Sequence, residues 1–290
     1  MVRDFPAFVV AALVTLAISV PGAAQVPFAA FDRASAPVLN DPHDLAFGPD
    51  GRLYVANKFG NEIVILDPKS LAVTGTFGNG ALYGVHDISF GPDGRAYVAA
   101  TGLNAIAVFR IEASGEAVFD GSFGPFSRPE GVLAHSNGRL YVMASGTGDL
   151  LALDGEMTVA RVGGLFGAHD VAQALDGSIW VADNNNSRLV QFSPDLEQLA
   201  VLEGPEFGFV GPRYLDVDDF GRLIVADQDA HRVLLIDPVA RKVLGVIGDG
   251  KPGFGVGVLD DPEGVAVRGN AYYFADSDNN RIVKYVVLVN

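Results

Sequence analysis

Three of the five histidines in this 290-residue sequence occupy one position of an internal repeat. That position lies eight residues before a recurrent turn glycine in five repeats, and Pro-Glu-Gly aligns the sixth. Every repeat places an ionisable residue there, in the chain order His43, His86, Glu130, His169, Arg213 and Glu263. Imidazole and carboxylate groups are ligands of divalent metals, and an arginine can hold an anion. A fold that brought these side chains together would therefore build a metal centre or a polar ligand site.

The repeat itself predicts the fold. Its turn glycines are separated by 43, 44, 39, 44 and 48 residues, and a complete unit contains four short segments rich in apolar residues. A period of about 40–45 residues with four strands per unit is typical of a β-propeller, with one blade per unit. We expect an all-β, six-bladed propeller with blades at about residues 39–80, 81–124, 125–164, 165–204, 205–250 and 251–290. The ionisable position opens the innermost strand of each blade, so the six residues should form a ring at the mouth of the central channel.

The sixth unit lacks its fourth strand, because the sequence stops after the third, at Asn290. Residues 27–32, Pro-Phe-Ala-Ala-Phe-Asp, precede the first blade and have no place in another unit. We predict that they pair with blade six as its outer strand and close the ring. Such closure removes the open seam that a linear array of blades would expose.

Several short motifs resemble the NHL-repeat family of six-bladed propellers. They are Pro262-Glu-Gly-Val-Ala-Val267, Phe274-Ala-Asp276 and Asn280-Arg-Ile282, with copies around Asp183 and Arg188 and around Asp227 and Arg232. The resemblance covers residues 39–290 and implies a protein-binding or ligand-binding propeller, or in a few cases an enzyme. It also implies that the repeated Asp and Arg residues pair or bond backbone groups within and between blades.

The contexts of the three histidines are similar to those of the zinc-binding histidines in the propeller lyases that produce peptide amides. The similarity implies zinc on His43, His86 and His169. Those lyases take their histidines from alternate blades, whereas here they fall in blades one, two and four. The lyases also use an arginine and a tyrosine, and Arg213 and Tyr214 offer both types. Adjacent strand residues point to opposite sides, so we expect Tyr214 to face a neighbouring blade.

The N-terminus has the features of a signal peptide at residues 1–24. Arg3 precedes an uncharged run from Phe5 to Val20, and small residues at Gly22 and Ala24 suit cleavage before Gln25. The alternative is a retained anchor helix, although the run is short for a membrane span and lacks a basic stop signal. We expect residues 25–290 to form one exported domain in the periplasm or the extracellular space. The sequence contains no cysteine, so packing alone must stabilise it there.

The net charge of −15 argues against nucleic-acid binding, because such a surface repels phosphate backbones. The leading functional prediction is a monomeric binding protein that takes a small ligand, a peptide or a protein segment at the channel mouth, with Arg213, Glu263 and Glu130 as ligand-binding residues. The alternative is a metal-dependent lyase or hydrolase with a divalent metal, zinc foremost, on His43, His86 and His169. A purely structural scaffold is the third class, and polar channel lining would explain the ring without chemistry.

Aromatic residues recur in the connectors that enter the innermost strands. They could surround a ligand groove above the ring, or they could wedge between blades as packing residues. The members are Tyr83, Phe126, Phe166, Phe207, Phe209 and Phe254.

Overall fold

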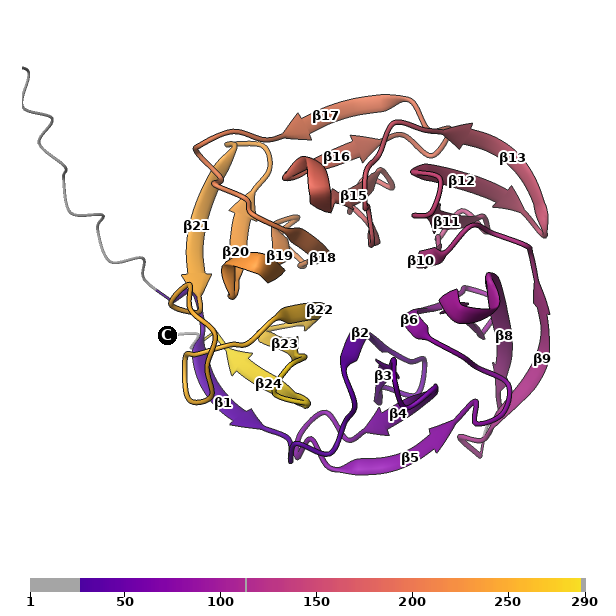
Figure 1. Ribbon diagram of the computed structural model, residues 1–290, viewed down its shortest axis with the longest axis horizontal. Coiled ribbons are helices and arrows are strands. Elements are labelled where there is room, and N and C mark those ends of the chain that lie inside the picture. The colour runs from indigo at the N-terminus through magenta and orange to yellow at the C-terminus, as the bar shows by residue number, and fades with distance from the viewer. Residues whose placement is uncertain (1–26, 113, 288–290) are drawn as a thin grey trace, which may run out of the picture.

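The computed structural model describes residues 27–112 and 114–287, which form six four-stranded antiparallel sheets arranged around a central channel (Figure 1). The predicted all-β, six-bladed propeller is confirmed. In blades one to five the strand nearest the channel is the first of its sheet, and Figure 1 places β2, β6, β10, β18 and β22 around the centre. The described residues contain no helix that is long and apolar enough to cross a bilayer. The leader predicted at residues 1–24 lies outside the described part of the chain.

The strands of each blade follow chain order from the channel outward. Blades one to three consist of β2 (Pro42–Phe47), β3 (Leu53–Asn57), β4 (Glu62–Leu66), β5 (Val73–Phe77), β6 (Val85–Phe90), β7 (Arg95–Ala100), β8 (Ala105–Ile111), β9 (Ala117–Phe123), β10 (Pro129–Ala134), β11 (Leu140–Ala144), β12 (Asp149–Asp154) and β13 (Met157–Val162). Blades four and five consist of β14 (Val171–Gln173), β15 (Ile179–Asp183), β16 (Arg188–Phe192), β17 (Gln198–Leu202), β18 (Pro212–Val217), β19 (Leu223–Asp227), β20 (Arg232–Asp237) and β21 (Lys242–Ile247). Single 3-10 turns follow the second strand in three blades: η1 (Thr101–Leu103), η2 (Asn184–Asn186) and η3 (Gln228–Ala230).

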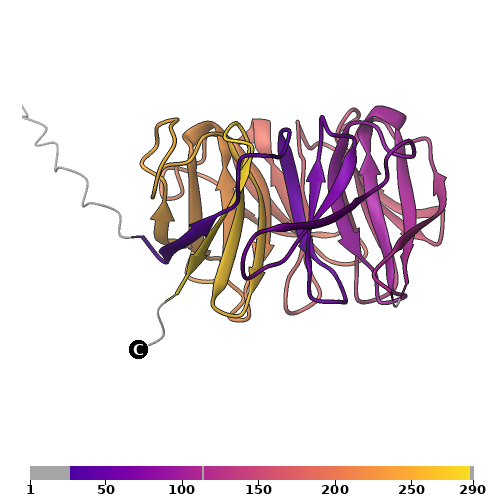
Figure 2. The same cartoon turned by 90° about the horizontal axis from the view of Figure 1, so that it is seen from below.

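Blade six closes the ring with the N-terminal strand, as the sequence predicts. Its own strands are β22 (Pro262–Arg268), β23 (Ala271–Asp276) and β24 (Arg281–Val286), and β1 (Ala30–Ala34) pairs antiparallel with β24. The strand begins three residues later than the predicted segment 27–32. Figure 2 shows indigo β1 beside yellow β24. Phe31 packs edge-on against Tyr285 with 5.6 Å between ring centroids, so side-chain packing reinforces the backbone pairing.

Neighbouring blades share their hydrophobic cores, because successive side chains of a strand point to opposite faces of its sheet. In β3, Tyr54 and Ala56 belong to the cluster shared with blade two, whereas Leu53 and Val55 pack with side chains of blade six. Both faces of β3 are therefore buried. This double burial explains why the strands appear in the sequence as nearly continuous apolar runs.

A recurring irregularity positions the ionisable ring. The pairing of the first and second strands shifts register around the ring residue in five blades, and in blade four β14 begins only at Val171, after His169. A residue left out of the ladder is free to turn its side chain away from the strand alternation. The bulge thus lets the ring residues converge at the channel.

Buried aspartates link neighbouring blades near the channel. Asp87 Oδ2 accepts the backbone N–H of Val132 in the next blade at 2.5 Å, and Asp216 Oδ2 accepts that of Val267 at 2.8 Å. Asp170 Oδ2 likewise accepts the N–H of Leu215, at 2.7 Å. These carboxylates satisfy amides that have no partner in their own sheet.

The repeated Asp and Arg residues have the structural role that the family resemblance implies. Arg232 Nη2 lies 2.7 Å from Asp227 Oδ2, and Asp227 Oδ1 accepts the N–H groups of Val210 and Gly211 in the incoming connector. Equivalent pairs join Arg188 to Asp183 and Arg281 to Asp276, at 2.6 and 2.7 Å. Each pair therefore fixes a connector to its blade.

Candidate functional site

The structure brings the predicted ring residues together at one end of the channel. The rings of His43 and His86 lie 4.6 Å apart, although they come from different blades. His43 also contacts Glu263, and His169 contacts Glu130. Five of the six side chains are buried, and Arg213 retains 20% of its side-chain exposure. The contacts divide the ring into two halves of different chemistry.

His43 forms the first half as the centre of a buried charge triad. Its Nδ1 lies 2.6 Å from Glu263 Oε2 and its Nε2 lies 3.3 Å from Asp41 Oδ2. Burial acts to lower the pKa of His43, but the charge of Glu263 and the bond to Asp41 outweigh it and raise this pKa. Lys58 and Arg213 add positive charge, at 3.0 Å from Asp41 and 3.5 Å from Glu263. Both ring nitrogens of His43 thus face carboxylates, an arrangement that favours the doubly protonated imidazolium.

Asp41, His43 and Glu263 are also the group of potential metal ligands whose donor atoms all lie within 4.8 Å of one another in the described residues. The three histidines predicted as metal ligands do not form such a group there. A metal ion in the triad would have to displace the imidazolium proton. The ion pairs already balance both carboxylates without one.

His86, Glu130 and His169 form the second half. The Nδ1 atoms of His86 and His169 lie 3.1 and 2.6 Å from the carbonyl oxygens of Gly84 and Gly167. A carbonyl only accepts, so each Nδ1 carries the proton and each neutral imidazole presents a lone pair on Nε2. The Nε2 of His169 lies 3.2 Å from Glu130 Oε2, and that of His86 lies 3.8 Å from Oε1.

In this half of the ring, hydrogen-bond acceptors face one another: the carboxylate of Glu130 faces the Nε2 lone pairs of His86 and His169. Burial lowers the pKa of both His86 and His169 to about 3, with contributions from the nearby charges of His43 and Arg213 respectively. Burial opposes ionisation of Glu130, but the two histidines and Arg128 lower its pKa to about 2. Glu130 Oε2 and His169 Nε2 are buried and have no hydrogen-bond partner. The carboxylate of Glu130 thus lies between two imidazole lone pairs, with one oxygen toward each, and the three donor atoms do not all lie within 4.8 Å of one another.

The donor types are those of a zinc site, and one of the two histidine–carboxylate distances has the matching length. Zinc binds imidazole nitrogen and carboxylate oxygen at about 2.0–2.2 Å in a tetrahedral site, which separates neighbouring ligand atoms by roughly 3.4 Å. The observed 3.2 Å between His169 Nε2 and Glu130 Oε2 is close to that spacing. The hydrogen bonds from Nδ1 to backbone carbonyls orient the rings in the way typical of metal-binding histidines.

A second layer of charge lies two residues before the ring position. Asp41, Arg128 and Asp261 occupy it in three blades, with φ of 56°, 50° and 52°. Glycine takes the same left-handed backbone in blades two and four, at Gly84 and Gly167. Charged residues are uncommon in this conformation, and sequence inspection did not single them out. Arg128 Nη2 bonds Glu130 Oε1 at 2.7 Å, so this layer contacts the ring directly.

A polar cavity of about 420 Å³ opens at the mouth beside Arg213 and Glu263. Gln228 organises its floor: Nε2 donates to Asp261 Oδ2 at 2.7 Å and to Glu263 Oε1 at 2.8 Å, while Oε1 accepts from Arg213 Nη1 at 2.6 Å. The remaining lining residues are Asn40, Asp41, Lys58, Phe59, Ser277, Asp278 and Asn280.

Gln228 and Lys58 were missed from the sequence, although a signal was present. Both stand directly after the end of the second strand of their blade, where every repeat has a polar residue. Ser277 stands at the same place in blade six and donates through Oγ to the carbonyl of Pro42 at 2.6 Å. Alignment of this position would have identified a second polar ring at the mouth.

Tyr214 packs against blade six, as expected: it is fully buried in the hydrophobic cluster that blade five shares with Val265 and Tyr272. The sequence did not predict that its hydroxyl also reaches the ring, where it lies 3.3 Å from His43 Nδ1 and donates to the carbonyl of His86 at 3.2 Å. Arg213 and Tyr214 therefore both contribute to the channel mouth.

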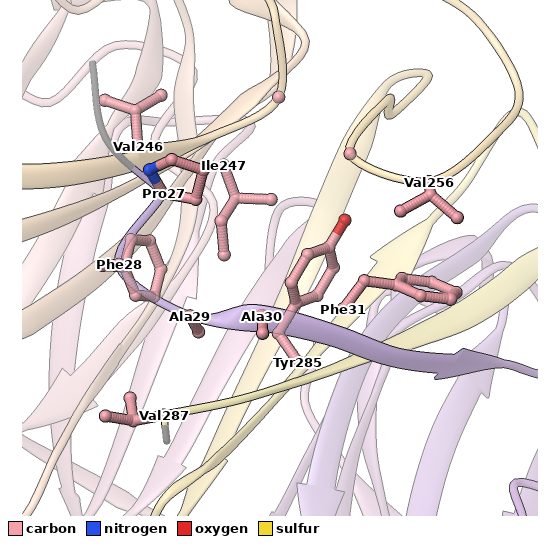
Figure 3. A pocket seen from close by; sticks show the side chains of 12 residues that line it. Pro27, Phe28, Ala29, Ala30, Phe31, Val246, Ile247, Val256, Tyr285 and Val287 are labelled. Carbon is pink, nitrogen blue, oxygen red and sulfur yellow. The ribbon is translucent and has the colours of Figure 1, made fainter. Parts of the chain in front are cut away.

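One cavity away from the mouth is mainly apolar. A cavity of about 550 Å³ lies on the outer wall between β21 and β1, and apolar side chains such as Phe28, Ile247 and Val256 line it (Figure 3). The connector aromatics divide between the two expected roles. Half of them are buried between blades, and half are exposed: Phe126, Phe207 and Phe209 against Tyr83, Phe166 and Phe254.

Residues 167–192 match the NHL repeat model. The chain is therefore a six-bladed β-propeller in which one blade segment matches the NHL repeat. Solved structures of other propellers are similar to the chain. Virginiamycin B lyase from Staphylococcus aureus is 14% identical in sequence and superimposes with a TM-score of 0.62. The match covers 88% of this chain and 99% of the lyase chain. The PQQ-bound aldose sugar dehydrogenase from Streptomyces coelicolor has 16% identity, a TM-score of 0.63, and coverage of 88% and 97%. At these identities the likeness shows the fold alone.

A curated relative matches only in part. The chloroplastic protein SUPPRESSOR OF QUENCHING 1 of Arabidopsis thaliana is 32% identical over 73 residues. The match covers 23% of this chain and 7% of the plant protein. The chain therefore corresponds to a small part of that relative's length.

Proposed function

We propose that this propeller binds a small polar ligand in the mouth cavity, above Arg213 and Glu263. The observation that carries the proposal is the state of the cavity floor. Arg213 Nε is buried and makes no aligned hydrogen bond within the protein, whereas Glu263 Oε2 already faces His43 Nδ1 at 2.6 Å. Buried polar groups are normally satisfied, and small-molecule sites combine a concave surface with a few convergent polar groups. A polar ligand would supply the missing partner.

The first experiment is a thermal-shift screen with glucose, succinate and putrescine as neutral, anionic and cationic probes. At least one probe should raise the melting temperature of the wild-type protein, because a ligand that binds only the folded state stabilises it. Glu263→Gln should abolish that shift. Asn40→Ala provides a second test at an exposed lining residue, and should weaken the same shift. No shift with any probe, or equal shifts in both variants, would refute binding at this place.

We also propose that the protein is exported and binds its ligand outside the cytoplasm. The support is the leader predicted at residues 1–24, with its cleavage site before Gln25. N-terminal sequencing of the protein from the periplasmic or culture fraction should begin at Gln25. An intact N-terminus in the membrane fraction would indicate the anchor instead.

A metal-dependent lyase or hydrolase is the second candidate. The contacts of Glu130 with His86 and His169 favour it, although a metal ion would have to draw the three donor atoms closer together. The proposed ligand set replaces His43 by Glu130. His43 is instead held between two carboxylates. A bound zinc ion would supply an activated water at neutral pH. The protein's own part is to hold each imidazole tautomer through Gly84 and Gly167 and to position the carboxylate.

Metal content tests this candidate independently of any activity. Protein purified and dialysed after zinc supplementation should contain about one zinc ion per chain, and His86→Ala combined with His169→Ala should remove it. His43→Gln should retain the zinc, since His43 belongs to the other half of the ring. Zinc that survives the double substitution, or its absence from the wild-type protein, would exclude this ligand set.

A further inference from the structure

We propose that the mouth cavity recognises a cationic nitrogen, an ammonium or guanidinium group, through the carboxylates of Asp261 and Asp278. The inference rests on the proposed function, because it names the chemistry of the ligand that this cavity takes. The candidate sources are a free amine and the basic side chain of a polypeptide, which share this group.

Two carboxylates that line the cavity, those of Asp261 and Asp278, take no part in its ion pairs. Asp41 pairs with Lys58 at 3.0 Å, and Glu263 faces Arg213 at 3.5 Å. His43 lies between these two carboxylates. Within residues 27–112 and 114–287, Asp261 and Asp278 have no ion-pair partner.

The polar groups around these carboxylates demand a donor rather than an acceptor. Asp261 accepts one hydrogen bond, from Gln228 Nε2, and the same nitrogen also serves Glu263. Glu263 is 2% exposed and lines the cavity, and His43 Nδ1 faces its Oε2 at 2.6 Å. Ionised carboxylates only accept. A cation bearing several N–H groups supplies the donors that Asp261 and Asp278 lack, whereas these two carboxylates would repel an anion.

The wall of the cavity adds an aromatic face. Phe59 is 61% exposed, and Lys58 Nζ already lies 4.7 Å from the centroid of its ring. A ligand cation in the cavity can use the same attraction between positive charge and an aromatic face. The volume of about 420 Å³ exceeds that of an ammonium group alone and admits a carbon chain behind it.

Calorimetric titration with three four-carbon probes separates charge from shape. Putrescine carries two ammonium groups, 1,4-butanediol is its neutral counterpart, and succinate is its anionic one. We expect putrescine to bind and the other two to fail. A capped lysine, Nα-acetyl-lysine methylamide, tests whether the cavity also binds the basic side chain of a polypeptide. Binding of either amine supports the inference.

Two substitutions test the carboxylates. Asp261→Asn and Asp278→Asn should each weaken amine binding roughly tenfold, the scale of one charge-assisted hydrogen bond. Asparagine tolerates the left-handed backbone at position 261, where φ is 52°, and Asp278 is exposed, so both variants should fold. The matched control is Glu203→Gln, an exposed acid directly after β17 that does not line the cavity, and it should leave the affinity unchanged.

The outcomes also separate this inference from the proposed function. Binding of succinate, butanediol or glucose in place of the amines would overturn the cation and leave a polar ligand cavity standing. Amine binding that is equal in all three variants would overturn the role of Asp261 and Asp278. Calcium chloride that binds and displaces putrescine, with the amine itself weak, would reassign the carboxylates to a metal ion. Failure of every probe would remove the proposed function as well.

Discussion

Replacement of Asp216 by asparagine should make the protein more stable at alkaline pH and leave it about equally or slightly less stable at acidic pH. Asp216 lies in the channel and accepts the N–H groups of Val217 and Val267 at 2.7 and 2.8 Å. Burial raises the pKa of its carboxyl group from 3.8 to about 7, in spite of those two hydrogen bonds. Ionisation of Asp216 therefore destabilises the folded protein relative to the unfolded chain.

The structure sets both the size and the sign of the effect. At about 1.4 kcal/mol per pKa unit, ionising Asp216 costs on the order of 4 kcal/mol more in the folded protein than in the unfolded chain. The folded state binds more protons than the unfolded state between pH about 4 and 7, so the contribution of Asp216 to stability is complete below the unfolded pKa and is lost as pH rises through the folded one. Asparagine cannot ionise. It gives up one acceptor, which offsets about 1–3 kcal/mol at every pH.

Urea unfolding at several pH values provides the assay. The single tryptophan, Trp180, is 3% exposed in blade four and reports unfolding by fluorescence. The difference in unfolding free energy between Asp216→Asn and wild type should move in favour of the variant as pH rises from about 4 to 8. The difference isolates Asp216 from other carboxylates that titrate in both proteins. A difference that is constant across this range would refute the reasoning.

Three further predictions follow from single contacts. Amine binding, measured by calorimetry, should strengthen about tenfold between pH 5 and 7.5. Burial and nearby carboxylates raise the pKa of Asp261 to about 6, and the amine binds its ionised form. An affinity that does not change over this pH range would contradict the prediction. Gly264→Ala should destabilise the fold by more than about 2 kcal/mol in urea, since its Cβ would lie 2.1 Å from the carbonyl oxygen of His43. The matched control Gly75→Ala, whose nearest neighbour would be 3.8 Å away, should have little effect. Phe31→Ala should cost roughly 2 kcal/mol by removing the aromatic contact that closes blade six, and an unchanged urea midpoint would argue against closure by β1.

The repeat makes the fold predictable from the sequence. A strand-turn-strand unit that recurs six times specifies its own partners, and the shared core between blades accounts for apolar runs without alternation. Even the closing strand follows, because the sixth unit is one strand short and only one apolar segment remains to supply it. The same alignment selects the ring, since equivalent positions in a cyclic array must lie at equivalent places.

The pairing within the ring could not be predicted in the same way. Alignment treats the six positions as equivalent, yet His43 is protonated between Asp41 and Glu263, and His169 is neutral against Glu130. The two histidines differ in the residue two places earlier in the sequence. Gly167 offers His169 only a carbonyl oxygen, whereas Asp41 offers His43 a carboxylate side chain.

Each blade has one bulge at the channel or one shortened strand, and this irregularity is what converts a packing motif into a candidate site. The register shift at Arg213 lets its side chain bond Gln228 at the channel mouth, while Tyr214 packs between blades five and six and reaches the ring with its hydroxyl. The repeat reveals which residue stands at each bulge, but it does not reveal which neighbour that residue contacts. The polar residues that repeat beside a bulge carry the remaining signal. Gln228 is the case in point, since it follows strand β19 in the alignment and bonds Arg213 and Glu263 in space.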